Sequence, residues 1–275
     1  MATSIDKAIA DASARIPRRE AELLAAHVLD VDRAWLATHA RHVPDAAQAA
    51  TYDLTVEARA LGTPVAYLLG EREFYSRPFR VDNRVLIPRP ETETLVEAAL
   101  ERVPAAAASV LDLGTGSGAV ALTLALERPQ WAVTAVDASE GALDCAQENA
   151  EALGCGDVVF LLSDWYAALE GWRFDAIVAN PPYVAQADPH LAQGDLRFEP
   201  RQALTDDSED GLGSIRAIVA GAGAHLNPGG WLLLEHGYDQ AEACRALFAA
   251  HGYTDFAAVA DLAGIARVAA GRFPS

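Results

Sequence analysis

Apolar residues in the first seventy positions recur at intervals of three and four, which places them on one face of an α-helix. No alternating run of β-branched residues interrupts this pattern, and Pro44 separates its last segment from the earlier ones. The sequence therefore predicts a small α-helical domain over residues 1–70. The expected helices are Ile5–Ala14, Arg19–Leu29, Arg33–Thr38 and Asp45–Leu61.

Short extended pieces replace the helical pattern between residues 71 and 90. Asp82–Asn83 is the turn signal among them, so we expect a β-hairpin linker here. Pro90 has the first-turn position of a helix that should continue to about Arg102. The extended pieces are Glu73–Tyr75, Phe79–Val81 and Val85–Ile87.

Apolar runs alternate with helical stretches throughout residues 91–275, which we assign to a catalytic domain. Strands that are apolar throughout and separated by helices indicate a parallel sheet buried on both faces. Phe256–Ala260 and Ile265–Ala270 lie too close together for a helical crossover, so they should form an antiparallel pair. The fold class is therefore α/β, a Rossmann-like sheet with a terminal antiparallel hairpin. Its other expected strands are Ser109–Leu113, Ala132–Asp137, Val158–Leu162, Phe174–Ala179 and Trp231–Glu235; its helices are Gly118–Glu127, Glu140–Leu153, Leu212–Ala224 and Gln240–His251.

The composition excludes several classes of protein. With 275 residues, 51% of them hydrophobic, the chain can bury a sizeable core and is neither disordered nor fibrous. The 21 basic and 39 acidic residues give a net charge of −18, which disfavours binding to a phosphate backbone. The 3 cysteines suit neither a disulfide framework nor a zinc site. With no apolar signal segment and no membrane span, a cytoplasmic location is expected.

A glycine-rich turn provides the first candidate site. Gly114, Thr115, Gly116, Ser117 and Gly118 follow an apolar strand and precede a helix, so the backbone can approach a ligand without Cβ interference. The next strand ends in an acid, Asp137, where a carboxylate can accept from both ribose hydroxyls. The spacing is G-x-G-x-G, unlike the G-x-G-x-x-G of a pyrophosphate site, and therefore suits the adenosine of S-adenosylmethionine. A tight strand-to-helix turn without a ligand is the alternative for this pattern alone.

The third strand contributes to the same crevice, because the carboxyl ends of neighbouring parallel strands meet at one edge. Asp164 follows that strand and can accept from an adenine amino group. Trp165 can form a wall beside the ring. A surface turn is the alternative interpretation of this pair.

Asn180, Pro181, Pro182 and Tyr183 follow the fourth strand and form the candidate catalytic motif. The prolines stiffen a turn at the carboxyl edge of the sheet. The side-chain carbonyl of Asn180 and the backbone carbonyl of Pro181 can together accept both hydrogens of a planar NH2 group, with Tyr183 as an aromatic face. This geometry selects an amide or the exocyclic amine of a base as methyl acceptor. A purely structural Pro-Pro turn is the alternative.

The chain resembles the release factor glutamine N5-methyltransferase family (the HemK/PrmC type) over essentially its full length. Gly114–Gly118 resembles the cofactor loop of that family, and Asn180–Tyr183 its target-amide motif. The segment Asp195–Pro200, followed by Ala203-Leu204, is more specific because generic amino-methyltransferases do not share it. Further matches are residues 72–75, 86–92, 233–237 and 267–272.

The resemblance implies that Gly114–Gly118, Asp137, Trp165 and Asn180 bind S-adenosylmethionine and that Asn180–Tyr183 receives a glutamine. The partner it implies is a class I peptide chain release factor, modified at the glutamine of its Gly-Gly-Gln sequence, with the helical domain recognising that partner. No metal is expected, since the acidic run of residues 206–210 lacks the spacing of a calcium loop. Phe74, Tyr75, Arg89 and Glu199 lie in the matching segments, and their roles stay open beyond that resemblance.

Three other functions remain as alternatives. A nucleic-acid methyltransferase acting on adenine N6 or cytosine N4 would use the same four-residue motif, against which stand the charge and the lack of a basic module. A nicotinamide-dependent oxidoreductase would require the other glycine spacing. A non-catalytic binding module would not need the Asn180 motif.

Overall fold

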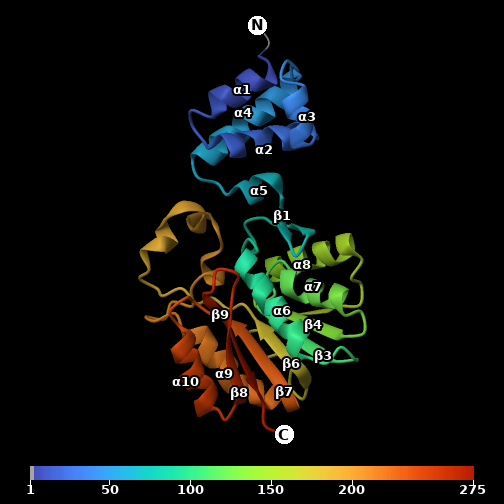
Figure 1. The fold of residues 1–275 in the computed structure, drawn as a ribbon, viewed down its shortest axis with the longest axis vertical. Helices are drawn as coiled ribbons and strands as arrows, with labels where there is room; N and C mark the ends of the chain where they lie inside the picture. The colour runs from blue at the N-terminus through green and yellow to red at the C-terminus, as the bar shows by residue number, and fades with distance from the viewer. Residues whose placement is uncertain (1–2) are drawn as a thin grey trace. The chain divides into compact units, whose positions relative to one another are not determined.

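The computed structural model describes residues 3–275 (Figure 1). These residues form two compact units. The helical unit comprises the chain up to Glu71 together with Gln193–Phe198, and the sheet unit comprises Arg72–Ala192 and Glu199–Ser275. The boundaries expected from the sequence placed residues 193–198 in the catalytic domain, and the structure groups them with the helices instead.

The helical unit has its own apolar core, which includes Ile5, Leu24, Tyr52 and Val56. Aspartate side chains cap the N-termini of two of its helices, α3 and α4. At α4, the side chain of Asp45 accepts from the backbone N–H of Gln48 in a capping box. The short helix that begins after Pro64 was not expected, because five residues are too few to show a helical period. The helices are α1 (Ile5–Ala12), α2 (Arg18–Leu29), α3 (Arg33–Thr38), α4 (Ala46–Ala60) and α5 (Val65–Leu69).

Arg59 on α4 explains why residues 193–198 belong to this unit. Its guanidinium contacts Oε2 of Glu20 at 2.6 Å and Oδ1 of Asp195 at 3.0 Å. Arg197 donates to the backbone carbonyl of Leu61 at 2.8 Å. Ion pairs between residues so far apart in the chain leave no periodic signal in the sequence.

The linker hairpin is present, but its turn differs from the expected one. Strands β1 (Glu71–Phe74) and β2 (Arg77–Arg80) pair with each other, and the turn lies at Tyr75 and Ser76, which have φ of 51° and 59°. The extended piece expected at Val85–Ile87 does not join the hairpin as a strand, and the backbone N–H of Ile87 donates to the Glu199 carboxylate instead. Asp82 does bend the chain, since its side chain accepts from the N–H of Arg84.

Among residues 3–275, the sheet unit contains one sheet of seven strands in the order β5-β4-β3-β6-β7-β9-β8. Its first five strands in that order pair in parallel, and β9 pairs antiparallel with both β7 and β8. The α/β fold class and the terminal antiparallel pair are thereby confirmed. The strands are β3 (Ser109–Leu113), β4 (Ala132–Asp137), β5 (Val159–Leu162), β6 (Phe174–Ala179), β7 (Leu226–Glu235), β8 (Thr254–Ala260) and β9 (Ala266–Arg272).

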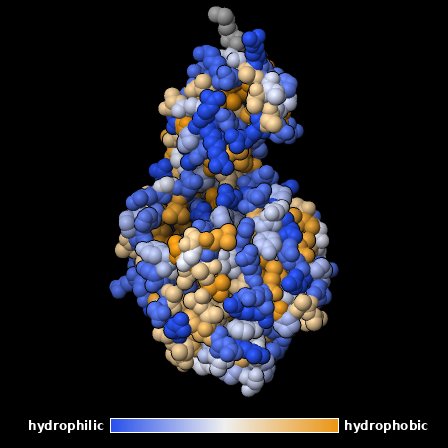
Figure 2. Space-filling view, in the orientation of Figure 1, coloured by the Kyte–Doolittle hydropathy of each residue, from blue (hydrophilic) through white to orange (hydrophobic). Residues whose placement is uncertain are grey.

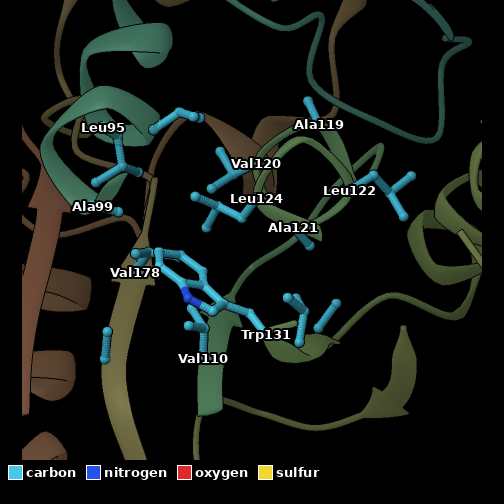
Figure 3. Close-up of a cluster of buried hydrophobic side chains, with 14 of the residues drawn as sticks. Leu95, Ala99, Val110, Ala119, Val120, Ala121, Leu122, Leu124, Trp131 and Val178 are labelled. Carbon is cyan, nitrogen blue, oxygen red and sulfur yellow. The ribbon is translucent and has the colours of Figure 1, made fainter. Parts of the chain in front are cut away.

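Helices cover both faces of this sheet, which explains its apolar strands. Val110 and Val178 point to one face, where they pack with Trp131 and with residues of α6 and α7 (Figure 3). Leu111 and Ile177, the neighbours of those valines in sequence, point to the opposite face, against α9 and α10. The covering helices are α6 (Glu93–Arg102), α7 (Ala119–Glu127), α8 (Glu140–Leu153), α9 (Gly213–His225) and α10 (Ala241–Ala250).

The strand order places a topological switch between β3 and β6. After β3 the chain proceeds outward through β4 to β5, and then returns to pair β6 on the other side of β3. Ligands of open α/β sheets bind in the crevice at such a switch, outside the carboxyl ends of the strands. No helix among residues 3–275 is both long and apolar enough to cross a membrane.

Candidate active site

A cavity of about 250 Å³ opens at the carboxyl ends of the central strands. Most of the site residues expected from the sequence line it, while Gly118, Pro181 and Tyr183 lie outside its lining. The expected residues in the lining are Gly114, Thr115, Gly116, Ser117, Asp137, Asp164, Trp165, Asn180 and Pro182.

The glycine turn after β3 is held against β4. The backbone N–H groups of Gly114 and Thr115 both donate to the carbonyl of Val136, at 2.9 and 3.0 Å. Gly116 has a φ of 56°, and a Cβ added to it would meet no atom within 4 Å. A side chain there would strain the backbone and enter open space, so glycine keeps the floor of the cavity clear. Gly118 has a packing role, because its Cβ would press on Leu122 and Ala146.

Asp137 at the end of β4 faces this turn. Its carboxylate accepts from the backbone N–H of Gly116 and of Ser139, each at 2.9 Å. Burial raises the pKa of Asp137, while these hydrogen bonds oppose the effect. The side chain therefore holds the glycine turn in shape as well as presenting a carboxylate to the cavity.

Asp112 also lines the cavity, and the sequence analysis did not select it as a site residue. It is buried and accepts from the Thr115 hydroxyl at 2.7 Å. Burial raises its pKa to about 7. The only sequence feature that could have identified Asp112 is its position inside an apolar strand. Burying a charged residue there destabilises the fold unless the residue has a partner.

The turn after β5 places Asp164 and Trp165 in the lining. The Ser163 hydroxyl donates to the carbonyl of Trp165 at 2.9 Å and accepts from the N–H of Ala168 at 3.0 Å. These bonds hold Trp165 at a positive φ of 47°. A Cβ on Gly114 would lie 3.7 Å from the indole, so the ring stands beside the glycine turn.

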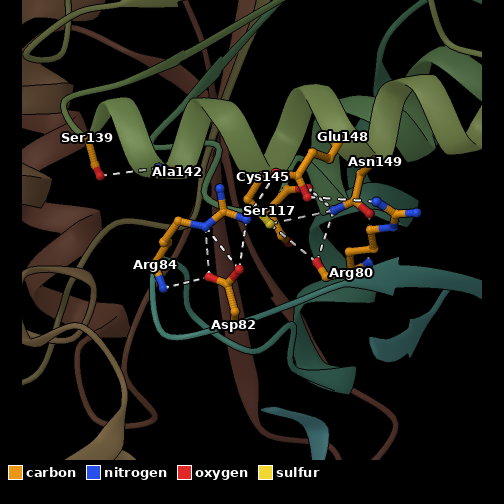
Figure 4. Close-up of polar contacts among 9 residues, drawn as sticks. All are labelled: Arg80, Asp82, Arg84, Ser117, Ser139, Ala142, Cys145, Glu148 and Asn149. Carbon is orange, nitrogen blue, oxygen red and sulfur yellow. Dashed lines mark hydrogen bonds and ion pairs between the residues drawn. The ribbon is translucent and has the colours of Figure 1, made fainter. Parts of the chain in front are cut away.

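Hydrogen bonds from α8 join the linker hairpin to the same turn (Figure 4). Asn149 on α8 donates from Nδ2 to the carbonyls of Ser117 and Arg80, and its Oδ1 accepts from the N–H of Arg80. Arg84 lines the cavity and bridges Asp82 and Glu148 at 2.7 and 3.1 Å. The hairpin, the glycine turn and α8 are thus joined by hydrogen bonds of one side chain.

The Asn-Pro-Pro-Tyr motif has a fixed geometry. Nδ2 of Asn180 donates to the hydroxyl of Thr92 at 3.1 Å, so Oδ1 is its remaining acceptor atom. The Tyr183 hydroxyl donates to Oε1 of Glu235 at 2.9 Å, and its pKa is raised by burial and by that carboxylate. Gln240 donates to the backbone carbonyl of Tyr183 at 3.0 Å. Pro181 is buried.

Two segments line the cavity without having been predicted as site residues, although the resemblance included both. One lies between Arg84 and Thr92, the other between Pro200 and Ala203. Arg89 and Ile87 bind the buried Glu199 carboxylate and so join the two. Their residues have no periodic pattern, and no chemistry of single side chains marks them as lining a cavity.

His236 is buried directly after Glu235 and has the features of a neutral histidine. Nδ1 donates to the carbonyl of Gly237 at 2.8 Å, and Nε2 has no partner among the described residues. Burial lowers its pKa.

Comparison with known proteins agrees with this fold. The family model for the methyltransferase small domain matches residues 91–209, and that for the PrmC N-terminal domain matches residues 4–70. A methyltransferase from Pyrococcus furiosus superposes with a TM-score of 0.57 at 17% identity, covering 80% of this chain and 98% of that one. A 16S rRNA methyltransferase of T. thermophilus, solved with AdoMet and guanosine, has a TM-score of 0.52 at 25% identity. The superposition covers 74% of this chain and 49% of that one. The sheet unit therefore contains a methyltransferase domain.

The curated relatives make the assignment more specific. The release factor glutamine methyltransferase of Xylella fastidiosa (strain Temecula1) is 53% identical over 97% of both chains. Its namesake in Burkholderia pseudomallei is 53% identical over 93% of this chain and 92% of its own, and that of Salmonella typhimurium 48% identical over 94% and 92%. The chain belongs to the release factor glutamine methyltransferase family, and its enzymatic class is glutamine methyltransferase.

Proposed function

We propose that this enzyme transfers a methyl group from S-adenosylmethionine to the side-chain nitrogen of a glutamine in a class I peptide chain release factor. The observation that carries the proposal is the orientation of Asn180 at the cavity. Its amide nitrogen is bound to Thr92, so its carbonyl oxygen is left to accept a hydrogen from the target NH2 group.

The carboxyl groups that line the cavity favour the binding of a positively charged cofactor. Asp112, Asp137 and Asp164 line it, while Arg84 is already paired with two acids. When bound, S-adenosylmethionine supplies a methyl group on a positively charged sulfonium. The phosphates of a dinucleotide would instead lie beside these carboxyls, which is unfavourable. The T. thermophilus methyltransferase solved with AdoMet supports the same choice.

The Asn180 motif accounts for the acceptor. Oδ1 of Asn180 and the carbonyl of Pro181 would hold the two hydrogens of the target amide, so that its nitrogen lone pair points at the methyl carbon. Formation of the N–C bond would be matched by cleavage of the C–S bond, whose electron pair would stay on sulfur. The amide nitrogen, held by these two carbonyls, would release one proton to water. The half-buried ring of Tyr183 would flank the amide, with its hydroxyl fixed to Glu235.

The names of the relatives support a release factor as the protein substrate. Such a substrate would place the enzyme in the cytoplasm, where translation terminates. We assign recognition of the partner to the helical domain of residues 1–70, because it has a separate core and holds none of the cavity lining. The linker hairpin and residues 91–275 would provide the cofactor and catalytic sites.

Transfer of labelled methyl groups tests this function against the nucleic-acid alternative. The enzyme is incubated with labelled S-adenosylmethionine and, separately, with a release factor, duplex DNA and ribosomal RNA. We expect label in the release factor, a mass increase of one methyl group on the Gly-Gly-Gln peptide, and none in a release factor whose glutamine is replaced by alanine. Label in DNA or RNA with an unmodified release factor would establish the alternative. The net charge of −18 argues against that outcome.

A further inference from the structure

Arg84 brings a positively charged side chain into a cavity whose carboxyl groups favour a positively charged cofactor. Its charge is balanced by two acids. Nε donates to both carboxylate oxygens of Asp82 at 2.9 Å, and Nη2 donates to Asp82 at 2.7 Å and to Glu148 at 3.1 Å. One positive and two negative charges leave these three side chains with a net charge of −1. Arg84 therefore does not oppose a sulfonium, and its role in the cavity follows from its shape and position.

The aliphatic stem of Arg84 lies against the first turn of α8 (Figure 4). A Cβ added to Gly141, in that turn, would have Cδ, Cγ and Cβ of Arg84 as its nearest atoms outside its own turn, at 3.4, 3.5 and 3.7 Å. Asp82 keeps the chain in this place, because its side chain accepts from the N–H of Arg84 and its carbonyl accepts from that of Val85. The stem is thereby fixed on the helix that begins beside the cavity.

This position puts Arg84 beside the residues expected to bind the ribose. Asp137, at the end of β4, accepts from the N–H of Ser139, the N-cap residue of α8. Asp137, Ser139 and Ala142 line the cavity together with Arg84. Asn180 follows β6, which lies on the other side of β3 from β4. Arg84 therefore belongs to the part of the cavity that lies away from the catalytic motif.

We infer that Arg84 is a further cofactor-binding residue, which covers the adenosine half of S-adenosylmethionine. The inference rests on the proposed function for the identity of the cofactor. Long arginine stems cover apolar surface, and the planar guanidinium stacks on aromatic rings. Both properties suit a nucleoside, which has a flat base and an uncharged ribose.

Glu148 is a positioning residue for Arg84. It lies on α8 outside the cavity lining, so it acts on the cofactor only through the guanidinium that it binds. An arginine that is free in the empty protein would lose rotamer freedom on binding a ligand. Glu148 and Asp82 order the side chain before the cofactor arrives, which favours binding.

Calorimetry on the unliganded enzyme tests the inference without methyl transfer. We expect the dissociation constant of S-adenosylmethionine to rise about 5- to 20-fold in Arg84→Ala, because contact area and a polar group are lost. Methylthioadenosine has the adenosine but lacks the amino acid part, and its affinity should fall by the same factor. An unchanged affinity for S-adenosylmethionine, or a loss that disappears with methylthioadenosine, would overturn the inference.

A double-mutant cycle tests the role of Glu148. Glu148→Gln keeps the shape of the side chain and removes its charge. It should raise the dissociation constant about two- to fivefold in the wild type and leave it unchanged in Arg84→Ala. Equal effects in the two backgrounds would show that Glu148 does not act through Arg84, and would overturn its positioning role.

Arg77→Ala is the matched control. Arg77 lies on the linker hairpin and pairs with Glu127 of α7 at 2.6 Å. Its side chain is 27% exposed, against 31% for Arg84, but it lies outside the cavity lining. Its removal should change the free energy of unfolding about as much as Arg84→Ala does and leave cofactor affinity within about twofold. An equal loss of affinity in Arg77→Ala would show that a loosened hairpin is the cause, and would overturn the role of Arg84.

The binding experiment also separates this inference from the proposed function. If the wild type binds S-adenosylmethionine but methylates no release factor, the proposed function fails, while the affinities still decide the role of Arg84. If the wild type binds the cofactor and Arg84→Ala binds it equally well, the inference alone fails. A wild type that binds no S-adenosylmethionine would overturn both.

Discussion

Arg89 and Glu199, 110 positions apart in the chain, form an ion pair in which the side chain of Glu199 is fully buried. The other oxygen of this carboxylate accepts from the backbone N–H of Ile87 at 3.0 Å. The pair joins the segment after the linker hairpin to the segment beginning at Pro200, and both line the cavity. It therefore closes one wall of the cavity.

Arg89→Ala should be strongly destabilising, because it leaves a buried carboxylate without its cation. Breaking such a pair from one side costs about 3–5 kcal/mol, and we expect the free energy of unfolding in urea to fall by roughly that amount. Arg89→Ala combined with Glu199→Gln should recover part of the loss. A single variant as stable as the wild type would show that the pair does not hold this wall.

Asn180→Ala should reduce turnover more than substrate binding. The hydrogen bond from the target amide strengthens as its nitrogen becomes pyramidal, so its loss falls on the transition state. Losing one such bond typically costs about 2.7–4 kcal/mol, or roughly a hundred- to thousandfold in rate. Single-turnover kinetics measure it. Asn180→Asp keeps an acceptor but places a carboxylate beside the sulfonium, and should also be slow.

Cofactor affinity should depend on pH through Asp112. Its pKa is raised to about 7 by burial, and a bound cation would lower it. Below pH 7 the carboxyl must lose a proton to bind a sulfonium cofactor, so the dissociation constant should rise up to about tenfold per unit as pH falls. Calorimetry from pH 5.5 to 8 measures this slope. Asp112→Asn should bind more weakly at pH 8 and show a smaller slope.

The Asp112 carboxyl should make the unliganded protein less stable as pH rises, although it makes cofactor binding tighter. A carboxyl whose pKa is higher in the folded state favours folding when protonated. Its contribution is complete below the ordinary carboxyl pKa of about 4 and is lost as pH rises to about 7. Thermal unfolding compared between the wild type and Asp112→Asn should show this difference over the same window.

Asn149 should matter for both stability and cofactor binding, because it joins the linker hairpin to the glycine turn (Figure 4). In Asn149→Ala the buried carbonyl of Ser117 loses its donor, at a cost of about 1–3 kcal/mol for each group left unsatisfied. Asn149→Asp keeps the acceptor for Arg80 but turns a carboxylate toward two carbonyls. We expect it to lower the free energy of unfolding more than Asn149→Ala does. Urea unfolding and calorimetry with S-adenosylmethionine distinguish the two variants.

The helical unit exposes large apolar side chains that suit recognition of a protein. Leu54 is 67% exposed and Leu61 is 70% exposed, and Figure 2 shows hydrophobic residues among the hydrophilic ones on this unit. We expect Leu54→Asp to lower kcat/KM for a whole release factor by tenfold or more. A short Gly-Gly-Gln peptide should be methylated as by the wild type. Equal loss on both substrates would contradict a recognition role.

The sequence alone determined the elements that depend on local periodicity. The strands Ser109–Leu113, Ala132–Asp137 and Phe174–Ala179 were predicted with the bounds that the structure has, since a strand buried on both faces must be apolar throughout. The glycine turn and the Asn180 motif were recognisable for a similar reason. Glycine at positive φ and two adjacent prolines constrain the backbone wherever they occur.

Tertiary structure alone decided which distant side chains support these motifs. The hairpin turn uses Tyr75 and Ser76, two residues that rarely adopt positive φ, whereas the turn signalled at Asp82–Asn83 forms after the hairpin. Glu199, Thr92 and Glu235 are each paired across 52 to 110 positions of the chain. A buried carboxyl is stable only beside donors that the fold brings to it, and no pattern along the sequence records which donors those are.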